Sequence, residues 1–417
     1  MTSGPTETLP ATSVATEAPT GRRYVQLVLV LGALIALGPL TIDMYLPAFP
    51  ALSAELGASD SATQLTLTGM LAGLAFGQLL IGPLSDALGR KRPLVAGLVT
   101  HAVASVLAAL APTIYVLASV RVLQGFAGAA ISVVAMATVR DLFSGYAVAR
   151  LMSRLMLVIG LAPIIAPSIG GVILEWTSWR GIFALLAATA VLLTFVAVLG
   201  LRETLPLERR RPLNLASTLR TYRSLLGDGS FMALILIGGL MMSAMFAYVA
   251  GSSFVLQDGY GLDELAFGLV FGANAAGLTI ASQLNPVLIG RWGVVNVLTG
   301  AMVVGLVAAA ALVVAGLTGA GGLLGVLVPL GVVVASVGLS LPNTPALALT
   351  RHGEAAGTAA AMLGAVQFGI GAVVAPLVGM FGSTSAAPMG GIMVAVTALA
   401  TLLMFAVVRR DPTVRLD

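Results

Sequence analysis

Twelve long apolar segments run through this chain of 417 residues, and they restrict its fold more than any other feature. Each is close to the ~20 residues that an α-helix needs to cross the hydrocarbon core of a bilayer. Only 9% of the residues are charged, which is too few for the surface of a soluble domain. The sequence therefore predicts an all-α membrane protein. The expected spans are 24–46, 62–82, 93–111, 114–137, 151–174, 181–201, 230–250, 265–288, 294–316, 322–341, 356–379 and 388–408.

The basic residues are distributed among the loops in a pattern that predicts the orientation. All 21 Lys and Arg residues except Arg121 and Arg180 lie in alternate connections or at their edges. Loops on the cytoplasmic side of a membrane carry such an excess. We therefore expect these connections and both termini on the cytoplasmic side of a cell (inner) membrane. The same bias explains the net charge of +4, so no nucleic-acid partner is expected.

The longest connection between spans divides the chain into two sets of six. Two six-helix halves related by an internal repeat are a known transporter plan, with the substrate site at their interface. The first residues are Thr, Pro, Ser and Ala-rich, a composition that cannot build a core. The predicted parts are a disordered cytoplasmic tail (1–21), an N-terminal half (22–201), a cytoplasmic linker (202–229), a pseudo-symmetric C-terminal half (230–410) and a cytoplasmic tail (411–417).

Two charged residues stand out within the apolar spans, and both are in the N-terminal half. Asp43 costs at least ~2.5 kcal/mol in lipid unless it faces the bundle interior or water, or takes up a proton. At 1.5 Å per residue, Arg121 lies about 10 Å below the outer surface, a depth similar to that of Asp43. We expect the two to pair and Arg121 to tune proton exchange at Asp43. The alternative is that Arg121 extends to the outer headgroups.

The connection between the second and third spans has a distinctive spacing. It reads Gly82-Pro83-Leu84-Ser85-Asp86-Ala87-Leu88-Gly89-Arg90-Lys91-Arg92-Pro93. The spacing resembles the loop shared by the major facilitator superfamily, although Ala87 stands where that pattern commonly has Arg. The resemblance implies a gate at the cytoplasmic end, built from Gly82, Asp86, Gly89, Arg90, Arg140 and Asp141.

The fifth span combines glycine and proline: Gly160, Pro163, Pro167, Gly170 and Gly171. Proline removes a helix hydrogen bond and kinks the helix, and glycine allows a neighbouring helix to approach closely. Simple packing would explain both. The arrangement also resembles the antiporter motif of drug exporters, with Ala166 in place of a usual Gly, and that resemblance implies export.

Further stretches resemble one subgroup of this superfamily. They are residues 41–50, 342–349 and 356–368, and the stretch 121–126 is similar to the arginine motif of proton-driven facilitators. Over about residues 22–410 the chain resembles the Bcr/CflA drug-resistance family, which includes bicyclomycin- and chloramphenicol-type exporters. Ile35 stands where some relatives have a second acid, so Asp43 is the only first-span carboxylate.

Aromatic and polar residues in the spans are candidates for the substrate site. An amphipathic solute is bound by aromatic walls with a few polar groups, and packing is an equally good explanation for most of them. The candidates are Tyr45, Gln124, Phe246, Tyr248, Asn274, Gln283, Asn343, Gln367 and Phe368. His101 in the third span is expected to be a packed polar residue.

The sequence leaves two modes of transport open. The first is a proton-coupled antiporter that exports small amphipathic drugs, and the alternative is a proton symporter that imports a small nutrient. A receptor or sensor is disfavoured because the chain has no sizeable soluble domain. We expect no enzyme, no catalytic residue, no metal and no cofactor other than the proton gradient. The expected partners are a drug-like substrate, the proton and the lipid bilayer, and we expect a monomer.

Overall fold

The computed structural model of the protein describes residues 21–143, 145–210, 212–350, 352, 355–382 and 384–411. This part of the chain is helical and contains no strand. Residues 1–20 and 412–417 of the predicted tails, and the loop residues Arg211, Arg351 and Arg415, lie outside the described residues. Residue 21, which we assigned to the tail, is the first residue of a helix instead.

Twelve helices in the described residues are long and apolar enough to cross a membrane, which confirms the predicted all-α fold. They are α1 (Gly21–Asp43), α3 (Asp60–Leu88), α4 (Lys91–Ala109), α5 (Ile114–Leu142), α6 (Gly145–Trp176), α7 (Trp179–Gly200), α9 (Gly229–Phe254), α10 (Glu264–Trp292), α11 (Val294–Thr318), α12 (Gly322–Leu349), α13 (Ala356–Met380) and α14 (Ala386–Ala406). Most of them begin before the predicted spans or continue beyond them, whereas α1, α4, α7 and α14 end one to three residues earlier than predicted.

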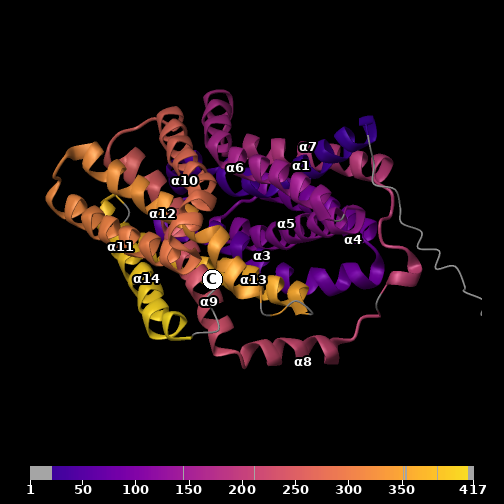
Figure 1. The fold of residues 1–417 in the computed structure, drawn as a ribbon. Helices are drawn as coiled ribbons and strands as arrows, with labels where there is room; N and C mark the ends of the chain where they lie inside the picture. Colours follow the sequence, from indigo (N-terminus) through magenta and orange to yellow (C-terminus); the bar gives the residue numbers. More distant parts are fainter. Residues whose placement is uncertain are drawn as a thin grey trace, which may run out of the picture.

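Several short helices connect or extend these spans. A turn after α1 leads into η1 (Leu46–Ala48) and α2 (Phe49–Glu55), and η3 (Val255–Gly259) extends α9. The linker contains η2 (Leu207–Arg209) and α8 (Leu215–Leu226), and η5 (Val408–Arg410) follows α14. We predicted the linker only as a basic connection, so its helix α8 is a new finding. Figure 1 shows α8 at the edge of the molecule.

The spanning helices form two groups that are consecutive in the sequence (Figure 1). In the first group α3 packs on α5, α4 on α5 and α7, and α1 on α6. In the second group α9 packs on α12, α13 and α14, and α11 on α12 and α14. The two groups meet along two helix pairs, α3 with α13 and α6 with α10. Residues at the boundary between the groups therefore come from both ends of the chain.

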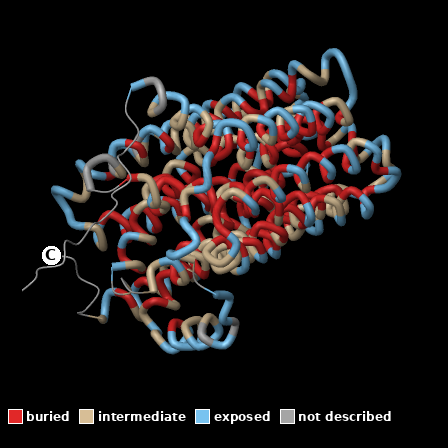
Figure 2. The backbone as a smooth tube through the Cα atoms, turned by 90° about the vertical axis from the view of Figure 1, so that its right-hand side faces the viewer, coloured by how far each residue is buried: buried red, intermediate tan, exposed pale blue. Residues whose placement is uncertain are grey.

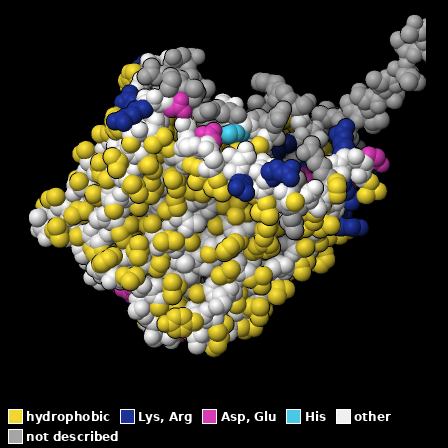
Figure 3. Space-filling model, turned by 90° about the horizontal axis from the view of Figure 1, so that it is seen from below, with side chains coloured by type: hydrophobic (Ala, Val, Ile, Leu, Met, Phe, Trp, Pro, Cys, Tyr) yellow, Lys and Arg dark blue, Asp and Glu magenta, His cyan; other side chains and the backbone are white. Residues whose placement is uncertain are grey.

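The surface of the bundle is apolar, as a lipid-facing surface requires. On α7, Leu192, Phe195 and Leu199 are 62%, 62% and 84% exposed. Buried residues lie inside the bundle and exposed ones outside it (Figure 2), and Figure 3 shows Lys and Arg side chains gathered along one side of a largely apolar face. We call the end of the bundle with Arg90, Lys91 and Arg210 the basic end, and the end with Glu55 and Asp263 the opposite end.

Candidate functional site

Asp43 is the last residue of α1, and the chain turns directly after it. If the helix continued, the ring of Pro47 would clash with the backbone carbonyl of Asp43, four residues earlier. The chain instead passes through Met44 and Tyr45 into η1, whose first turn contains Pro47. This turn places Asp43 at a helix end inside the bundle, where it is 4% exposed.

The carboxylate of Asp43 has no hydrogen bond or ion pair within the described part of the chain. The turn after Asp43 leads into η1, which packs on α9 and α10 as well as on α6. Because α9 belongs to the second group of helices, Asp43 lies at the boundary between the two groups. A buried carboxylate without a counter-ion is costly as an anion, and this cost favours the uptake of a proton or a cation.

The predicted ion pair between Arg121 and Asp43 is wrong for this structure. The guanidinium donates from Nη2 to the backbone oxygen of Thr41 at 3.1 Å and from Nη1 to Oε1 of Gln124 at 2.6 Å. The helix ends at Asp43, so the last carbonyl oxygens of α1 lack helical partners and attract a cation. Our estimate from depth considered only the position along the helix axes and overlooked these oxygens.

Arg121 is also covered by aromatic rings. Its guanidinium carbon lies 4.4 Å from the ring centroid of Tyr45 and 5.7 Å from that of Phe183, both within the range of a cation–π interaction. The residue has no exposed surface, so it does not extend to the headgroups as the alternative prediction required. Two predicted substrate residues, Tyr45 and Gln124, therefore contact Arg121.

Two replacements of Arg121 distinguish the role of its charge from the role of its size. We expect Arg121→Met to reduce transport at least tenfold, because the buried oxygens of Thr41 and Gln124 lose a donor, at about 1–3 kcal/mol each. We expect partial activity from Arg121→Lys, since an ammonium group keeps the charge but not the planar fork. The measurements are drug efflux and the melting temperature of the purified protein. Wild-type efflux in the Met variant would contradict the assignment.

The other predicted substrate residues fall into separate pairs in the C-terminal half. Asn274 donates to the hydroxyl oxygen of Tyr248 at 3.2 Å, and the Tyr248 ring stacks on Phe271 at 4.9 Å. The rings of Phe246 and Phe368 lie 6.1 Å apart. Tyr248 and Asn274 thus form one pair across α9 and α10, and Phe246 and Phe368 form another across α9 and α13.

The remaining candidates in this half lie elsewhere. Asn343 exchanges two hydrogen bonds with Asn285, at 2.8 and 3.0 Å, so its amide is already bonded. Gln367 lies beside Gly238, and Gln283 is exposed on α10. Nothing in the sequence singled out Asn285, because the role of an amide in an apolar span depends on its hydrogen-bond partner, which the sequence does not show.

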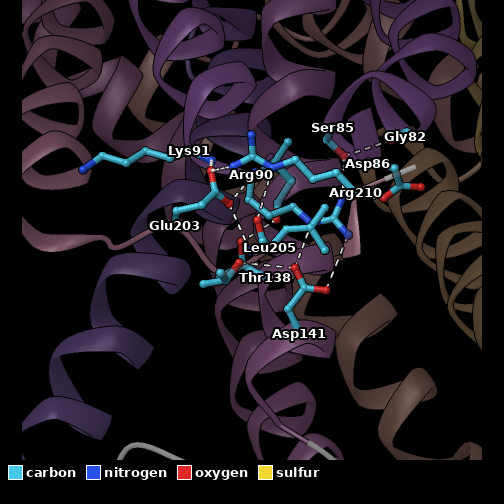
Figure 4. A network of polar contacts seen from close by, with 12 residues as sticks. Gly82, Ser85, Asp86, Arg90, Lys91, Thr138, Asp141, Glu203, Leu205 and Arg210 are labelled. Carbon is cyan, nitrogen blue, oxygen red and sulfur yellow. Dashed lines mark hydrogen bonds and ion pairs between the residues drawn. The ribbon is translucent and has the colours of Figure 1, made fainter. Parts of the chain in front are cut away.

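The predicted gate motif forms a network at the basic end (Figure 4). Arg90 donates to Asp86 at 2.6 Å, to Asp141 at 2.8 Å and to Ser85 at 2.7 Å. Burial opposes the charge of Arg90, but the hydrogen bonds from Arg90 to the two carboxylates outweigh it and raise its pKa. The network joins the α3–α4 turn to the end of α5.

Two details of this motif differ from our predictions. The segment from Gly82 to Leu88 is helical and belongs to α3, so only Gly89 and Arg90 form the turn, and Asp86 and Arg90 stand one helical turn apart. Arg140, which we expected in the gate, is exposed and forms none of the ion pairs in the described residues. It directly precedes Asp141 on α5, and neighbouring helix residues face different directions.

Glu203, in the linker, is a member of the network that the sequence did not indicate (Figure 4). Its carboxylate accepts hydrogen bonds from the backbone nitrogens of Arg90 at 2.8 Å and Lys91 at 3.2 Å, at the start of α4. Burial opposes the charge, but these bonds and one from Leu205 hold the pKa of Glu203 below its usual value. An anion at a helix N-terminus is also stabilised by the helix dipole.

Gly89 shows how closely the linker approaches this turn. Its φ angle is +87°, which L side chains rarely adopt. An added Cβ would also lie 2.5 Å from the carboxylate of Glu203 and 2.7 Å from the guanidinium of Arg210. Both the backbone angle and the space therefore require glycine at this position.

The glycines of the predicted antiporter motif on α6 face two different neighbours. An added Cβ at Gly170 would lie 1.9 Å from the carbonyl oxygen of Met44, the residue after Asp43. At Gly171 and Gly160 it would lie 2.9 Å from Glu264 and 3.1 Å from Thr279, both on α10. Helix α6 continues through Pro163 and Pro167. The motif thus connects the Asp43 turn to the C-terminal half.

Within the described residues, side chains form direct hydrogen bonds between the two groups of helices. These bonds lie in the half of the bundle that extends from its middle to the opposite end. Gln64 on α3 is fully buried; it donates to the backbone oxygen of Ala250 at 3.0 Å and accepts from the backbone nitrogen of Gly379 at 2.8 Å. Ser253 donates to the backbone oxygen of Leu46 at 2.7 Å. The opposite end is therefore closed, and the sequence did not reveal Gln64 as part of this closure.

Twelve spanning helices in two groups of six, with a buried carboxylate at their boundary, are the architecture of a secondary transporter. Residues 31–376 match the Major Facilitator Superfamily, and the chain belongs to this family of multi-pass membrane transporters. The chain is 40% identical over 393 residues to an uncharacterized MFS-type transporter, YdgK, of Bacillus subtilis, covering 93% of this chain and 96% of that protein.

Two further relatives have names that refer to antibiotics. A bicyclomycin resistance protein homolog of Haemophilus influenzae is 31% identical over 393 residues, covering 92% of this chain and 96% of the relative. A chloramphenicol resistance protein of Pseudomonas aeruginosa is 30% identical over 346 residues, covering 82% and 81%. These relatives extend over most of both half-bundles.

Solved structures show the same fold at low identity. A bacterial homolog of the human lysosomal transporter Spinster is 15% identical, with a TM-score of 0.73 over 96% of this chain and 100% of that chain. The xylose transporter XylE from E. coli is 16% identical, with a TM-score of 0.72 over 93% and 98%. At these identities the likeness concerns the fold alone.

Proposed function

We propose that this protein is a proton-coupled antiporter that exports small amphipathic drugs across the cell (inner) membrane. The observation that carries the proposal is Asp43, a buried carboxylate without a counter-ion at the boundary of the two halves. The resistance proteins for bicyclomycin and chloramphenicol among its relatives support the substrate class and the Bcr/CflA subgroup.

Coupling follows if the proton and the substrate compete for the same carboxylate. A protonated Asp43 is neutral and suits its buried place, whereas an ionised Asp43 needs a substrate or water to compensate its charge. Substrate from the cytoplasm then binds the ionised form, and a proton from the outside displaces it. Tyr248 and Asn274 are the proposed polar substrate contacts, with Phe246 and Phe368 as an aromatic wall.

The orientation follows from the charges at the basic end. An excess of Lys and Arg marks the cytoplasmic side of a membrane protein, so we infer that the basic end faces the cytoplasm. The closed opposite end then faces outward, and substrate enters from the cytoplasm. In this orientation Asp86, Arg90, Asp141 and Glu203 form the proposed cytoplasmic gate, which positions α3, α4 and α5 relative to the linker.

Import of a nutrient by proton symport is the alternative, and it uses the same carboxylate. The glycines of α6 favour the antiporter, because Gly170 brings this helix against the Asp43 turn while Gly160 and Gly171 bring it against α10. Such close packing excludes water beside a proton site, which limits proton leak when no substrate is bound. The two antibiotic-resistance relatives favour export as well.

The direction of exchange decides between the two modes. Inside-out vesicles from an exporter-deficient host, acidified within, should accumulate radiolabelled chloramphenicol or bicyclomycin and release protons. For one proton per neutral substrate, each pH unit supports about a tenfold concentration ratio. Vesicles from cells without the protein are the control. Loss of preloaded solute together with protons would identify a symporter, and no response from a broad drug panel would overturn the proposed substrate class.

A further inference from the structure

Five buried residues at the end of α1 form a closed ring of hydrogen bonds. Nε2 of His101 lies 3.0 Å from Oγ1 of Thr41, and Oγ of Ser105 donates to the backbone oxygen of His101 at 2.7 Å. Gln124 donates to Ser105 at 2.8 Å and accepts from Arg121 at 2.6 Å. Arg121 closes the ring by donating to the backbone oxygen of Thr41 at 3.1 Å. The ring joins α1, α4 and α5.

A count of hydrogens assigns the protonated nitrogen of His101. The hydroxyl group of Thr41 has one hydrogen, and it donates this hydrogen to the backbone oxygen of Leu37 at 2.6 Å. Its oxygen must therefore accept from His101, so Nε2 carries a hydrogen. The hydroxyl hydrogen of Ser105 is likewise used, because it is donated to the backbone oxygen of His101 at 2.7 Å. Nδ1 lies 3.4 Å from Oγ of Ser105 and therefore receives no hydrogen from it.

The charges around the ring favour a neutral imidazole. A hydrogen on Nδ1 as well would make a second buried cation in the same hydrogen-bonded ring as Arg121, and none of the five ring members is a carboxylate. On α1 the nearby acid is Asp43, which makes no bond to the ring. The other ionisable groups on elements packed against α4 lie toward helix ends or connections: Asp60, Asp86, Tyr115, Arg140, Asp141 and Arg180.

We propose that His101 is a positioning residue for the Asp43 site, acting as a neutral Nε2–H donor to Thr41. Thr41 is held by His101 through its side chain and by Arg121 through its backbone oxygen. Asp43 is two residues further along the same helix, and α1 ends there. The ring thereby fixes the last turn of α1 and the place of the carboxylate. The consequence for transport rests on the proposed function, whereas the protonation state of His101 does not.

The protonated nitrogen can be observed without any transport. The chain has two histidines, so ¹⁵N-histidine labelling of the His352→Asn variant leaves one ring to observe. We expect the nitrogen spectrum at pH 7 to show a neutral ring with its hydrogen on Nε2. A ring protonated on both nitrogens, or on Nδ1 alone, would overturn the proposal. This result is independent of whether the substrate has been identified.

Two amide variants test the positioning role. The amide nitrogen of Gln reaches the place of Nε2, whereas that of Asn reaches only the place of Nδ1. We expect His101→Gln to keep the wild-type pH profile and at least about half of the exchange rate. We expect His101→Asn to lower kcat about tenfold with KM unchanged, since Thr41 loses its donor. Equal activity of both variants would refute positioning, and an altered pH profile in His101→Gln would show that the ring itself carries protons.

Discussion

Asp43→Asn should abolish uphill drug accumulation while leaving downhill exchange of drug for drug in place. An amide has nearly the shape of the carboxyl group but cannot release or bind the transported proton. For one proton per neutral substrate, the ratio supported by one pH unit should fall from about ten to one. The measurements are uptake into acidified inside-out vesicles and counterflow in vesicles without a gradient.

The control for this experiment is the same type of substitution at an exposed acidic residue. Glu175 is exposed at the end of α6, so Glu175→Gln changes the same type of charge without touching the site. We expect wild-type accumulation from this variant. If Asp43→Asn still accumulated drug and released protons, another group would carry the proton. If it lost counterflow as well, Asp43 would be needed for binding or for the movement of the halves.

Gly170→Ala should reduce efflux at least tenfold, and Gly170→Leu should abolish it. The added Cβ would lie 1.9 Å from the carbonyl oxygen of Met44, so the turn after Asp43 or helix α6 must move. Overpacking of this kind costs about 1–3 kcal/mol for a small side chain and more for a large one. The measurements are drug accumulation in intact cells and proton leak in vesicles.

A matched variant separates this contact from the general effect of alanine in a helix. Gly277 lies inside α10, and nothing stands within 4 Å of an added Cβ there. Gly277→Ala should therefore transport like the wild type. The amount of each variant in the membrane is measured by immunoblot. Normal efflux from Gly170→Ala would contradict the close contact, and a loss of membrane protein would assign the effect to folding instead.

The sequence predicted the spans well because the bilayer imposes a local requirement. A helix that crosses it needs about 20 apolar residues whatever its neighbours are, so each span is recognisable from its own segment. The end of α1 was predicted less accurately, because the expected span continued to residue 46 whereas the helix ends at Asp43, four residues before Pro47. The helix α8 was missed because the linker lacks the length and apolar character that identify a span.

The partners of the polar residues were predicted less well. Asp86, Asp141 and Arg90 were expected together from the resemblance to a family motif, and the structure brings them together. Glu203 carries no such spacing, since it lies more than a hundred residues from the backbone nitrogens that it binds. The expected partner of Arg121 was wrong for a related reason. Arg121 binds a backbone oxygen at a helix end, and every residue has a backbone oxygen, so the residue types do not indicate which one is available.

The sequence by itself determined that this chain has twelve spanning helices, with one acid, Asp43, and one base, Arg121, standing out within their apolar segments. These features depend on the polarity and length of single segments, because each segment that crosses the bilayer must satisfy its own backbone hydrogen bonds there. The tertiary structure alone decided that Arg121 binds Thr41 and Gln124, that Gly170 touches the Asp43 turn, and that Gln64 closes the opposite end. These contacts depend on how each helix is rotated and which helix lies beside it, and both are set by the packing of segments far apart in the chain.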